Sequence, residues 1–365
     1  MIRSDSRNEN AFTALVALSL VLLIGSIFTI SNPLFAQSSD DAYRVRPEVA
    51  DRINDAWKLY RKGQIRQTLN QLSPLLSRSD LPPDVYLLAG RAYFDRNNFS
   101  RSSRQLRKAL DRLRNHESRP NVERYLKRSD ALRELKLRKR TFAHFTILRV
   151  PELSATRVSN LNHDLEKARR RIGGDLDLML DKRLTVILYR RPQYRRVVEA
   201  PVWSGGVFDG KIPLPFREDS DNPYTQRTLY HEYSHALIHE MARDNVPLWF
   251  NEGFATYQEY RQSREHFKYR QLPSNPPPKH VRNLEDVSAM FRDTNDRNEA
   301  RLAYEYSYSL VKFMEERFGL ISLRRILQET GRTSSFEKAV ENELGRSLES
   351  LQFSWENWVN QEIRR

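Results

Sequence analysis

The feature that most constrains this chain is the stretch TLYHEYSHALIHEM at residues 228–241, which holds three of the eight histidines. His231 and His235 are four residues apart, about one helical turn, so an α-helix would place both imidazoles on one face. Glu232 lies beside them, which completes the H-E-x-x-H pattern of two metal ligands and a carboxylate base. The stretch therefore predicts a helix that offers two ligands to a metal ion.

A catalytic zinc needs a third protein ligand and an open position. His239 is a poor candidate, because eight residues of helix separate it from His231 by about 12 Å, whereas two ligands of one tetrahedral ion lie only about 3.3 Å apart. We expect His239 to lie outside the site. Glu252 is the better candidate, since a proline-bearing turn precedes it and a second helix could direct its carboxylate to the histidines. The alternative is that Glu252 is only a favourable acid in the first turn of a helix.

The N-terminal region predicts export. Ala11 to Ile30 form an uncharged, mostly apolar run that is long enough to cross a bilayer as a helix. Ala36, with Leu34 two residues before it, is a passable signal-peptidase site. We expect residues 1–36 to be a signal that is either cleaved near Ala36 or kept as an inner-membrane anchor through residues 11–30, and the rest of the chain to be periplasmic. The alternative is a buried core helix, but the run has no amphipathic pattern.

Composition narrows the chemistry. The chain has no cysteine, which excludes disulfides, thiolate nucleophiles and cysteine-bound metal. Its net charge of +14 would suit nucleic acid. In an exported chain, however, solvated faces or attraction to anionic envelope surfaces explain that charge better. We expect no nucleic-acid partner.

Residues 51–118 contain an internal repeat. AWKLYRKGQIRQTLNQLSPLL and GRAYFDRNNFSRSSRQLRKAL align at an offset of 34 residues, which pairs Ala56 with Gly90 and Leu72 with Leu106. This period, with small residues where two helices cross, resembles tetratricopeptide repeats, and the alternative is a generic pair of helical hairpins. We expect helical repeats over 51–139, with a charged helix at 121–139, that serve as a scaffold or bind a protein partner.

After the repeats the pattern changes to strands that lead into helices, which is an α+β layout. We expect a linker at 37–50, a catalytic region at 140–262, a Pro-rich loop at 263–298 and a helical C-terminal part at 299–365. Within these, the predicted strands are 141–150 and 183–189, with a helix between them at 155–172. Residues 202–215 predict a strand pair that turns at Asp209-Gly210.

The motifs together resemble a known family. HEYSH followed by VPLWFNEGFATYQEY is similar to the gluzincin metallopeptidases, and HFTILRV with GGVFDGKIPLP resembles the peptidase MA-like branch, which is related to the M1 aminopeptidases. The resemblance covers about residues 141–330. It implies a thermolysin-like α+β catalytic domain in which His231, His235 and Glu252 bind Zn²⁺. It also implies that Glu232 is the general base that activates a water on the zinc.

The same resemblance suggests that Tyr304, in AYEYSYSLVKFMEERFG, donates to the oxyanion, although Tyr306 and Tyr308 are neighbouring alternatives. The G-x-M-E-N stretch of the M1 exopeptidases is absent, so we expect an endopeptidase that acts on peptide or protein substrates. The strand pair around Gly205–Leu214 could bind an extended substrate by edge pairing. The competing hypothesis is an envelope scaffold in which the repeats bind partners and the peptidase fold is vestigial.

Overall fold

A computed structural model of the protein describes residues 46–78, 81–113, 118–198, 210–216, 223–243, 245–261, 273, 281–294 and 296–364. The described residues form two compact units, 46–137 and 138–364, which we call the helical unit and the C-terminal unit. The predicted signal or anchor at 1–36, including its apolar run at 11–30, lies outside the described residues. In the described part of the chain, no helix combines the length and hydrophobicity that a bilayer crossing requires.

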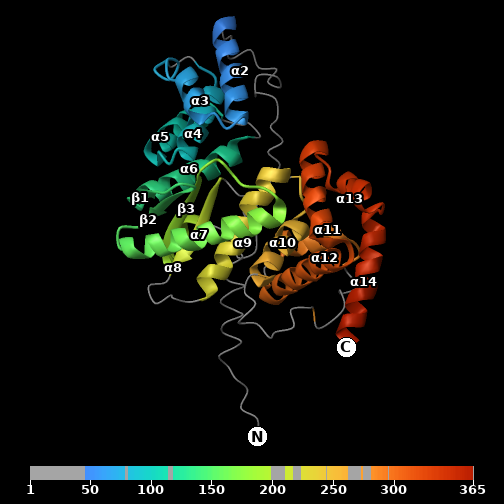
Figure 1. The fold of residues 1–365 in the computed structure, drawn as a ribbon. Coiled ribbons are helices and arrows are strands. Elements are labelled where there is room, and N and C mark those ends of the chain that lie inside the picture. Colours follow the sequence, from blue (N-terminus) through green and yellow to red (C-terminus); the bar gives the residue numbers. More distant parts are fainter. Residues whose placement is uncertain are drawn as a thin grey trace. The chain divides into compact units, whose positions relative to one another are not determined.

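The helical unit consists of two helical hairpins and a further helix (Figure 1). Its elements are α2 (Pro47–Arg61), α3 (Ile65–Leu72), α4 (Pro83–Asp95), α5 (Phe99–Leu110) and α6 (Arg119–Glu134). Gly63 and Asn97, which the 34-residue offset pairs, both have positive φ values, 71° and 61°, in the turns between the helices of each hairpin. The sequence repeat is therefore also a repeat of backbone geometry.

Apolar residues at helical spacing form the core of this unit. Leu72, Leu88 and Leu106 are fully buried. Gly90 lies where α4 meets α5, and a Cβ on it would lie 2.7 Å from the Leu106 side chain. Because no side chain larger than hydrogen fits there without movement, the small residue sets how closely the two helices approach.

The C-terminal unit begins with a four-stranded sheet in the order β1-β2-β3-β4. The strands are β1 (Arg138–Thr141), β2 (Phe145–Arg149), β3 (Leu184–Arg190) and β4 (Lys211–Phe216). β1 is antiparallel to β2, while β2, β3 and β4 are parallel. Helix α7 (Ala155–Leu176) connects β2 to β3, as parallel pairing requires, and α8 (Arg191–Val198) follows β3.

One strand prediction needs correction, and a second can be compared only in part. The strand predicted for 141–150 is β2, but residues 138–141 form a separate strand that turns back through residues 142–144. β1 reads RKRT and is exposed along its length, so no hydrophobic alternation marked it. Of the strand pair predicted for 202–215, only the part from residue 210 is described; it is β4, paired with β3, and residues 202–209 lie outside the described chain.

Helices complete the C-terminal unit: α9 (Pro223–Ala242), α10 (Leu248–Arg261), α11 (Leu284–Asp293), α12 (Arg297–Thr333), α13 (Phe336–Leu344) and α14 (Leu348–Arg364). The prediction of a Pro-rich loop throughout 263–298 is wrong, because α11 lies within it. A reciprocal capping box between Asn283 and Asp286 starts this helix. Val287 and Phe291 are buried. The neighbouring prolines obscured this short apolar pattern.

Close backbone packing joins α12 to the two helices of the predicted site. A Cβ on Gly253 of α10 would overlap the carbonyl oxygen of Ser307 in α12. Gly331 of α12 meets the carbonyl oxygen of Met241 in α9 in the same way. In Figure 1, α9, α10 and α12 accordingly lie together, and α10 is buried over most of its length. The unit is mostly helical with a small sheet, which is compatible with the predicted α+β class.

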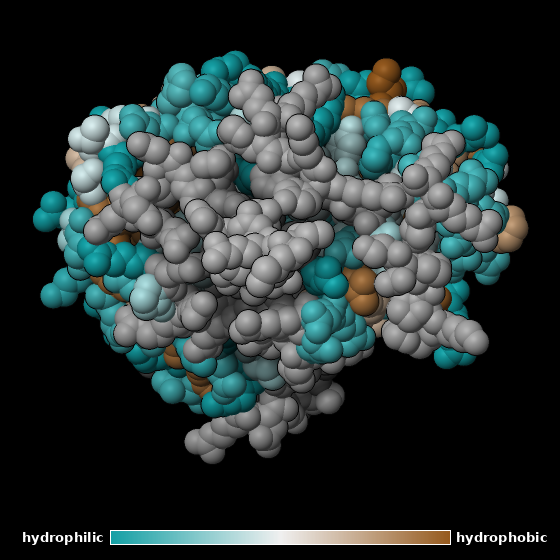
Figure 2. Space-filling model, turned by 90° about the horizontal axis from the view of Figure 1, so that it is seen from below, coloured by the Kyte–Doolittle hydropathy of each residue, from teal (hydrophilic) through white to brown (hydrophobic). Residues whose placement is uncertain are grey.

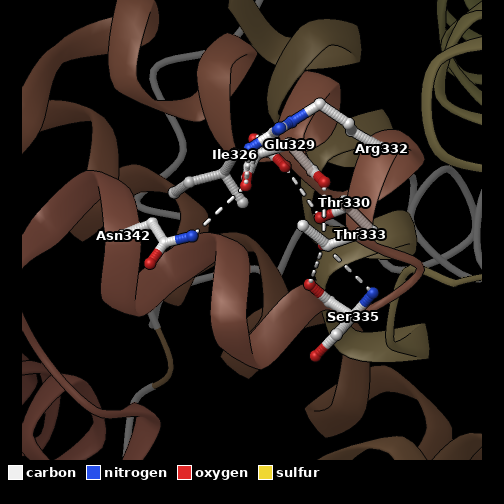
Figure 3. A network of polar contacts seen from close by, with 7 residues as sticks. All are labelled: Ile326, Glu329, Thr330, Arg332, Thr333, Ser335 and Asn342. Atoms are coloured by element: carbon white, nitrogen blue, oxygen red, sulfur yellow. Dashed lines mark hydrogen bonds and ion pairs between the residues drawn. The ribbon is translucent and has the colours of Figure 1, made fainter.

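The end of α12 is joined to α13 by polar contacts (Figure 3). Glu329 accepts hydrogen bonds from Arg332 at 2.7 and 2.9 Å, and from the side-chain amide of Asn342 in α13 at 3.2 Å. On the face shown in Figure 2, the described side chains are mostly hydrophilic. The large hydrophobic side chains exposed in the described chain are scattered along the sequence: Met179, Ile321 and Phe353.

Candidate metal centre

His231, His235 and Glu252 come together in the interior of the C-terminal unit. Each offers one ligand atom, and these atoms all lie within 4.8 Å of one another. Nε2 of His231 lies 3.4 Å from Oε2 of Glu252, and Nε2 of His235 lies 3.6 Å from Oε1. All three side chains are buried. The two histidines come from α9 and the glutamate from α10, as the spacing in the sequence predicts.

Local sequence explains how the two helices are placed. Successive turns of α9 carry His231 and His235, whose rings lie 4.8 Å apart between centroids. α9 ends at Ala242, and Arg243 has a left-handed φ of 57° that reverses the chain. The carbonyl of Pro247 accepts the first hydrogen bonds of α10, from the backbone of Phe250 and Asn251. The short turn returns α10 against α9 and places Glu252 opposite the histidines.

The outer nitrogens of the two histidines have different neighbours. Nδ1 of His235 lies 2.8 Å from Oδ1 of Asn251, a neutral acceptor. Nδ1 of His231 lies 3.3 Å from Oε2 of Glu259, a carboxylate. Both contacts favour the tautomer that carries its proton on Nδ1 and leaves Nε2 free to bind a metal ion.

Three residues around the site were not predicted from the sequence, although each lies at a regular spacing from, or next to, a predicted ligand. Arg227 is one turn before His231, Asn251 directly precedes Glu252, and Glu259 follows Glu252 by two turns. Arg227 Nη2 lies 3.0 Å from Oε1 of Glu259, and both side chains are only 2% exposed. Helical spacing from His231 and from Glu252 could have identified Arg227 and Glu259, and adjacency to Glu252 could have identified Asn251.

Glu232 is buried beside His231, and its Oε1 atom has no hydrogen-bond partner. Burial raises the pKa of this carboxyl well above its ordinary range, and the nearby carboxylates of Glu252 and Glu259 add to the rise against the opposing effect of His231. A carboxyl group with an unpartnered oxygen next to His231 could exchange a proton there.

Tyr304 is the tyrosine that the structure brings to the cluster. Its ring centroid lies 6.4 Å from that of His231. Burial raises the pKa of its hydroxyl well above the ordinary value, and the negative charge of Glu252 adds to the rise. Phe291 of α11 packs edge-on against Tyr304 at 4.9 Å. The two alternatives make other ring contacts: Tyr306 with Trp355 in the core, and Tyr308 with Tyr260.

His239 is half-buried near the end of α9 and does not belong to the His–His–Glu cluster found in the described chain. This agrees with the geometric argument that a straight helix cannot bring it to the ion that His231 would bind.

Charges inside the cluster depend on one another. Burial opposes protonation of His231, but its contacts with Glu252 and Glu259 outweigh burial and raise the pKa of the imidazole to about 10. Burial lowers the pKa of His235, and the opposing effect of Glu252 does not reverse this. Burial acts to raise the pKa of Glu252, yet the two histidines hold it below its ordinary value. The cluster is therefore one electrostatic unit.

The residues present fit a metal ion. Nε2 of both histidines and both oxygens of Glu252 are buried without a well-formed hydrogen bond, although buried polar atoms are nearly always satisfied. The separations of 3.4 and 3.6 Å between the facing ligand atoms are close to the roughly 3.3 Å expected between two ligands of one tetrahedral zinc. A cation between these atoms would satisfy all of them.

Comparison with known proteins gives one family. No curated protein matches this chain. The family model of the Peptidase MA superfamily matches residues 170–361, a range that includes α9, α10 and α12 and more than half of the chain. This finding confirms the predicted resemblance to peptidase MA-like proteins, and the chain belongs to the Peptidase MA superfamily.

Proposed function

We propose that this protein is an exported zinc-dependent peptidase that hydrolyses peptide bonds within polypeptides. The observation that carries the proposal is the buried His231–His235–Glu252 cluster, whose facing nitrogen and oxygen atoms lack hydrogen-bond partners. The outer nitrogen of His235 is hydrogen-bonded to Asn251, and that of His231 lies 3.3 Å from the Glu259 carboxylate. Two imidazoles and a carboxylate are a usual donor set for catalytic zinc, and they leave a fourth position open. Membership of a metallopeptidase superfamily supports the same chemistry.

When bound, zinc supplies Lewis-acid polarisation of a carbonyl and lowers the pKa of water. In this proposal Glu232 takes a proton from the attacking water and transfers it to the leaving amine. Support for that role comes from its unpartnered Oε1 atom and from its position directly after His231. Tyr304 donates a hydrogen bond to the developing oxyanion, and the contact of its ring with that of His231 supports this assignment over Tyr306 and Tyr308.

Substrate is proposed to bind in an extended form. β4 ends the strand order of the described sheet, and it precedes α9 in the chain. A peptide that pairs with a strand edge satisfies its backbone groups without regard to sequence, while side-chain contacts select among substrates. Pairing along a substrate chain suits an endopeptidase.

Three parts of the proposal rest on sequence. Export, with residues 11–30 as cleaved signal or retained anchor, follows from the apolar N-terminal run. The relation to M1 aminopeptidases follows from the quoted motifs. The tetratricopeptide-like character of residues 51–139 follows from the 34-residue offset, and we propose that these repeats position a substrate or bind a protein partner.

The decisive experiment measures metal content and hydrolysis together. Purified wild-type protein is expected to hold about one zinc per chain and to cleave members of a peptide library. Glu232→Gln should keep the zinc and reduce hydrolysis by at least the 10²–10⁴-fold typical of a lost acid–base group. Hydrolysis at the wild-type rate by Glu232→Gln would refute the assignment of the base. A natively folded protein that takes up no zinc would instead favour the scaffold hypothesis.

A further inference from the structure

An ion pair lies behind the histidine cluster, on the side away from Glu252. Arg227 of α9 and Glu259 of α10 approach to 3.0 Å between Nη2 and Oε1. Each side chain is only 2% exposed. Burying a charged pair costs a large desolvation free energy, which its mutual attraction repays only with good geometry and further hydrogen bonds. Such a pair is weak evidence for stability, and its position has to be explained in another way.

Glu259 contacts two partners with its two oxygens. While Oε1 faces Arg227, Oε2 lies 3.3 Å from Nδ1 of His231. Nε2 on the opposite side of the same imidazole faces Glu252 at 3.4 Å. A continuous line of contacts therefore runs from Arg227 through Glu259 to the atom of His231 that would bind metal.

The guanidinium of Arg227 is itself held in place. Its Cζ atom lies 4.6 Å from the ring centroid of Tyr260, a cation–π distance, and the Tyr260 ring packs against Tyr308 of α12 at 5.4 Å. Arginine suits this position because its planar group can stack on a ring and bind a carboxylate at the same time. The arrangement restricts where the Glu259 carboxylate can lie.

The second histidine is supported differently. Nδ1 of His235 contacts the neutral oxygen of Asn251 at 2.8 Å. Hydrogen bonds to a charged acceptor are roughly twice as strong as those between neutral groups, and outer contacts of ligand histidines commonly contribute 10–100-fold to metal affinity. Of the two histidines, His231 is therefore the one whose outer nitrogen faces a carboxylate.

From these contacts we propose that Arg227 is a positioning residue for metal binding. It holds Glu259, and Glu259 fixes the orientation and tautomer of His231 so that Nε2 faces Glu252. This inference rests on the proposed function only in that the His231–His235–Glu252 cluster binds zinc; it does not depend on what the protein hydrolyses.

The test measures zinc affinity of the full chain by competition with a chromophoric chelator, with zinc alone as the probe. The variants are Glu259→Gln, Arg227→Met, Arg227→Lys and the double variant Arg227→Met/Glu259→Gln. Arg261→Met is the matched control, because Arg261 also lies on α10 and pairs with a carboxylate, Asp175 of α7, outside the cluster. Circular dichroism and the absorption of the cobalt-substituted site report folding and ligand geometry separately from activity.

We expect Glu259→Gln to bind zinc 10–100-fold more weakly than wild type and Arg227→Met to bind about 10-fold more weakly. Arg227→Lys should restore part of the affinity, while Arg261→Met should match wild type. Because Arg227 acts through Glu259, the double variant should bind no more weakly than Glu259→Gln alone. The double variant also removes both buried charges, so it keeps the test valid if Arg227→Met does not fold.

Two results would overturn the inference: wild-type zinc affinity and cobalt spectrum in folded Arg227→Met, or losses in the double variant that add up as for independent sites. If wild type binds no zinc, the inference and the proposed function both fail. If wild type binds zinc but cleaves no peptide, the proposed function fails, and the zinc affinities of the variants still decide the role of Arg227.

Discussion

The two units of this protein bury different kinds of side chain. In the helical unit, the buried polar residues are mostly small or neutral: Thr68, Ser102, Ser103, Gln105 and Ser129, with Asp84 the exception among the described residues. In the C-terminal unit, charged and titratable groups are buried: Lys211, Arg227, His231, Glu232, His235, Glu252 and Glu259. Because burial of an ionisable group is costly unless it is paired or binds a metal, this contrast identifies where the chemistry lies.

The net charge of the two units differs in the opposite direction: the unit that buries fewer charged side chains carries more net positive charge. Residues 46–137 contain 21 Lys and Arg against 11 Asp and Glu, whereas residues 138–365 contain 37 against 32. Much of the chain's net charge of +14 therefore belongs to the smaller unit. Its ion pairs are solvated, as in Arg107–Asp130, where the side chains are 48% and 24% exposed. An excess of solvated positive charge affects solubility and non-specific association rather than the fold.

The largest expected effect tests whether the contrast in buried charge marks a metal site. His235→Ala should lose the bound zinc and all measurable hydrolysis, because it removes one of three protein ligands. His239→Ala, one turn further along α9, should keep both. Metal analysis of the two purified proteins provides the comparison, with circular dichroism to show that both are folded. Equal zinc content in the two variants would contradict the ligand assignment.

The next largest effect is expected at Tyr304, where a substitution distinguishes a catalytic role of this tyrosine from a structural one. Tyr304→Phe should lower kcat by about 10²–10³-fold, the usual loss for one oxyanion donor, and should leave zinc content unchanged. Tyr308→Phe is the matched control, because its ring contacts Tyr260 and not a ligand histidine. Steady-state kinetics on one cleaved peptide checks both. A larger loss in Tyr308→Phe would transfer the assignment to that residue.

A smaller effect is expected from glycine substitutions that test close helix packing in each of the two units. Gly253→Ala would place a methyl group against the backbone oxygen of Ser307, and backbone cannot move aside as a side chain can. We expect a loss of about 1–3 kcal/mol in the free energy of unfolding, together with weaker hydrolysis because α12 carries Tyr304. Gly90→Ala in the helical unit meets mainly the Leu106 side chain and should leave hydrolysis unaffected.

Gly174→Ala is the control for both glycine variants, since nothing lies within 4 Å of its added methyl group. It should stabilise the protein by about 0.5–1 kcal/mol, as alanine does in a helix interior. Chemical denaturation measures all three. If Gly253→Ala were as stable as Gly174→Ala, close approach of α10 to α12 would not explain the glycine.

The smallest effect concerns the surface contacts of α12 and α13 (Figure 3). Hydrogen bonds from Arg332 hold the pKa of Glu329 below its ordinary value, with a further contribution from Asn342. A carboxyl whose pKa is depressed on folding stabilises the protein above its unfolded pKa and loses that contribution as the pH falls through the folded value. Glu329→Gln should therefore lower Tm slightly at pH 7 and not at pH 3. A Tm difference that grows on acidification would have the wrong sign.

Local patterns predicted much of this protein. The spacing of His231 and His235 required a helix, and α9 is that helix. The residues after the proline-bearing turn predicted α10, and the structure brings Glu252 to the histidines. These predictions worked because helical periodicity is a property of residues three or four apart. α11 and β1 were missed because prolines or exposed charges obscured the pattern, and the ligand roles themselves stay predictions until metal is measured.

The sequence by itself determined the two helices of the candidate site, the family and the inward-facing residues of that site. Only the tertiary structure decided which residues stand behind the three residues of the His–His–Glu cluster. Glu259 reaches His231, and Arg227 reaches Glu259, because α10 packs on α9 in one rotation, with α12 close against Gly253. Contacts between helices depend on how whole surfaces interlock, and a short motif carries no record of that packing.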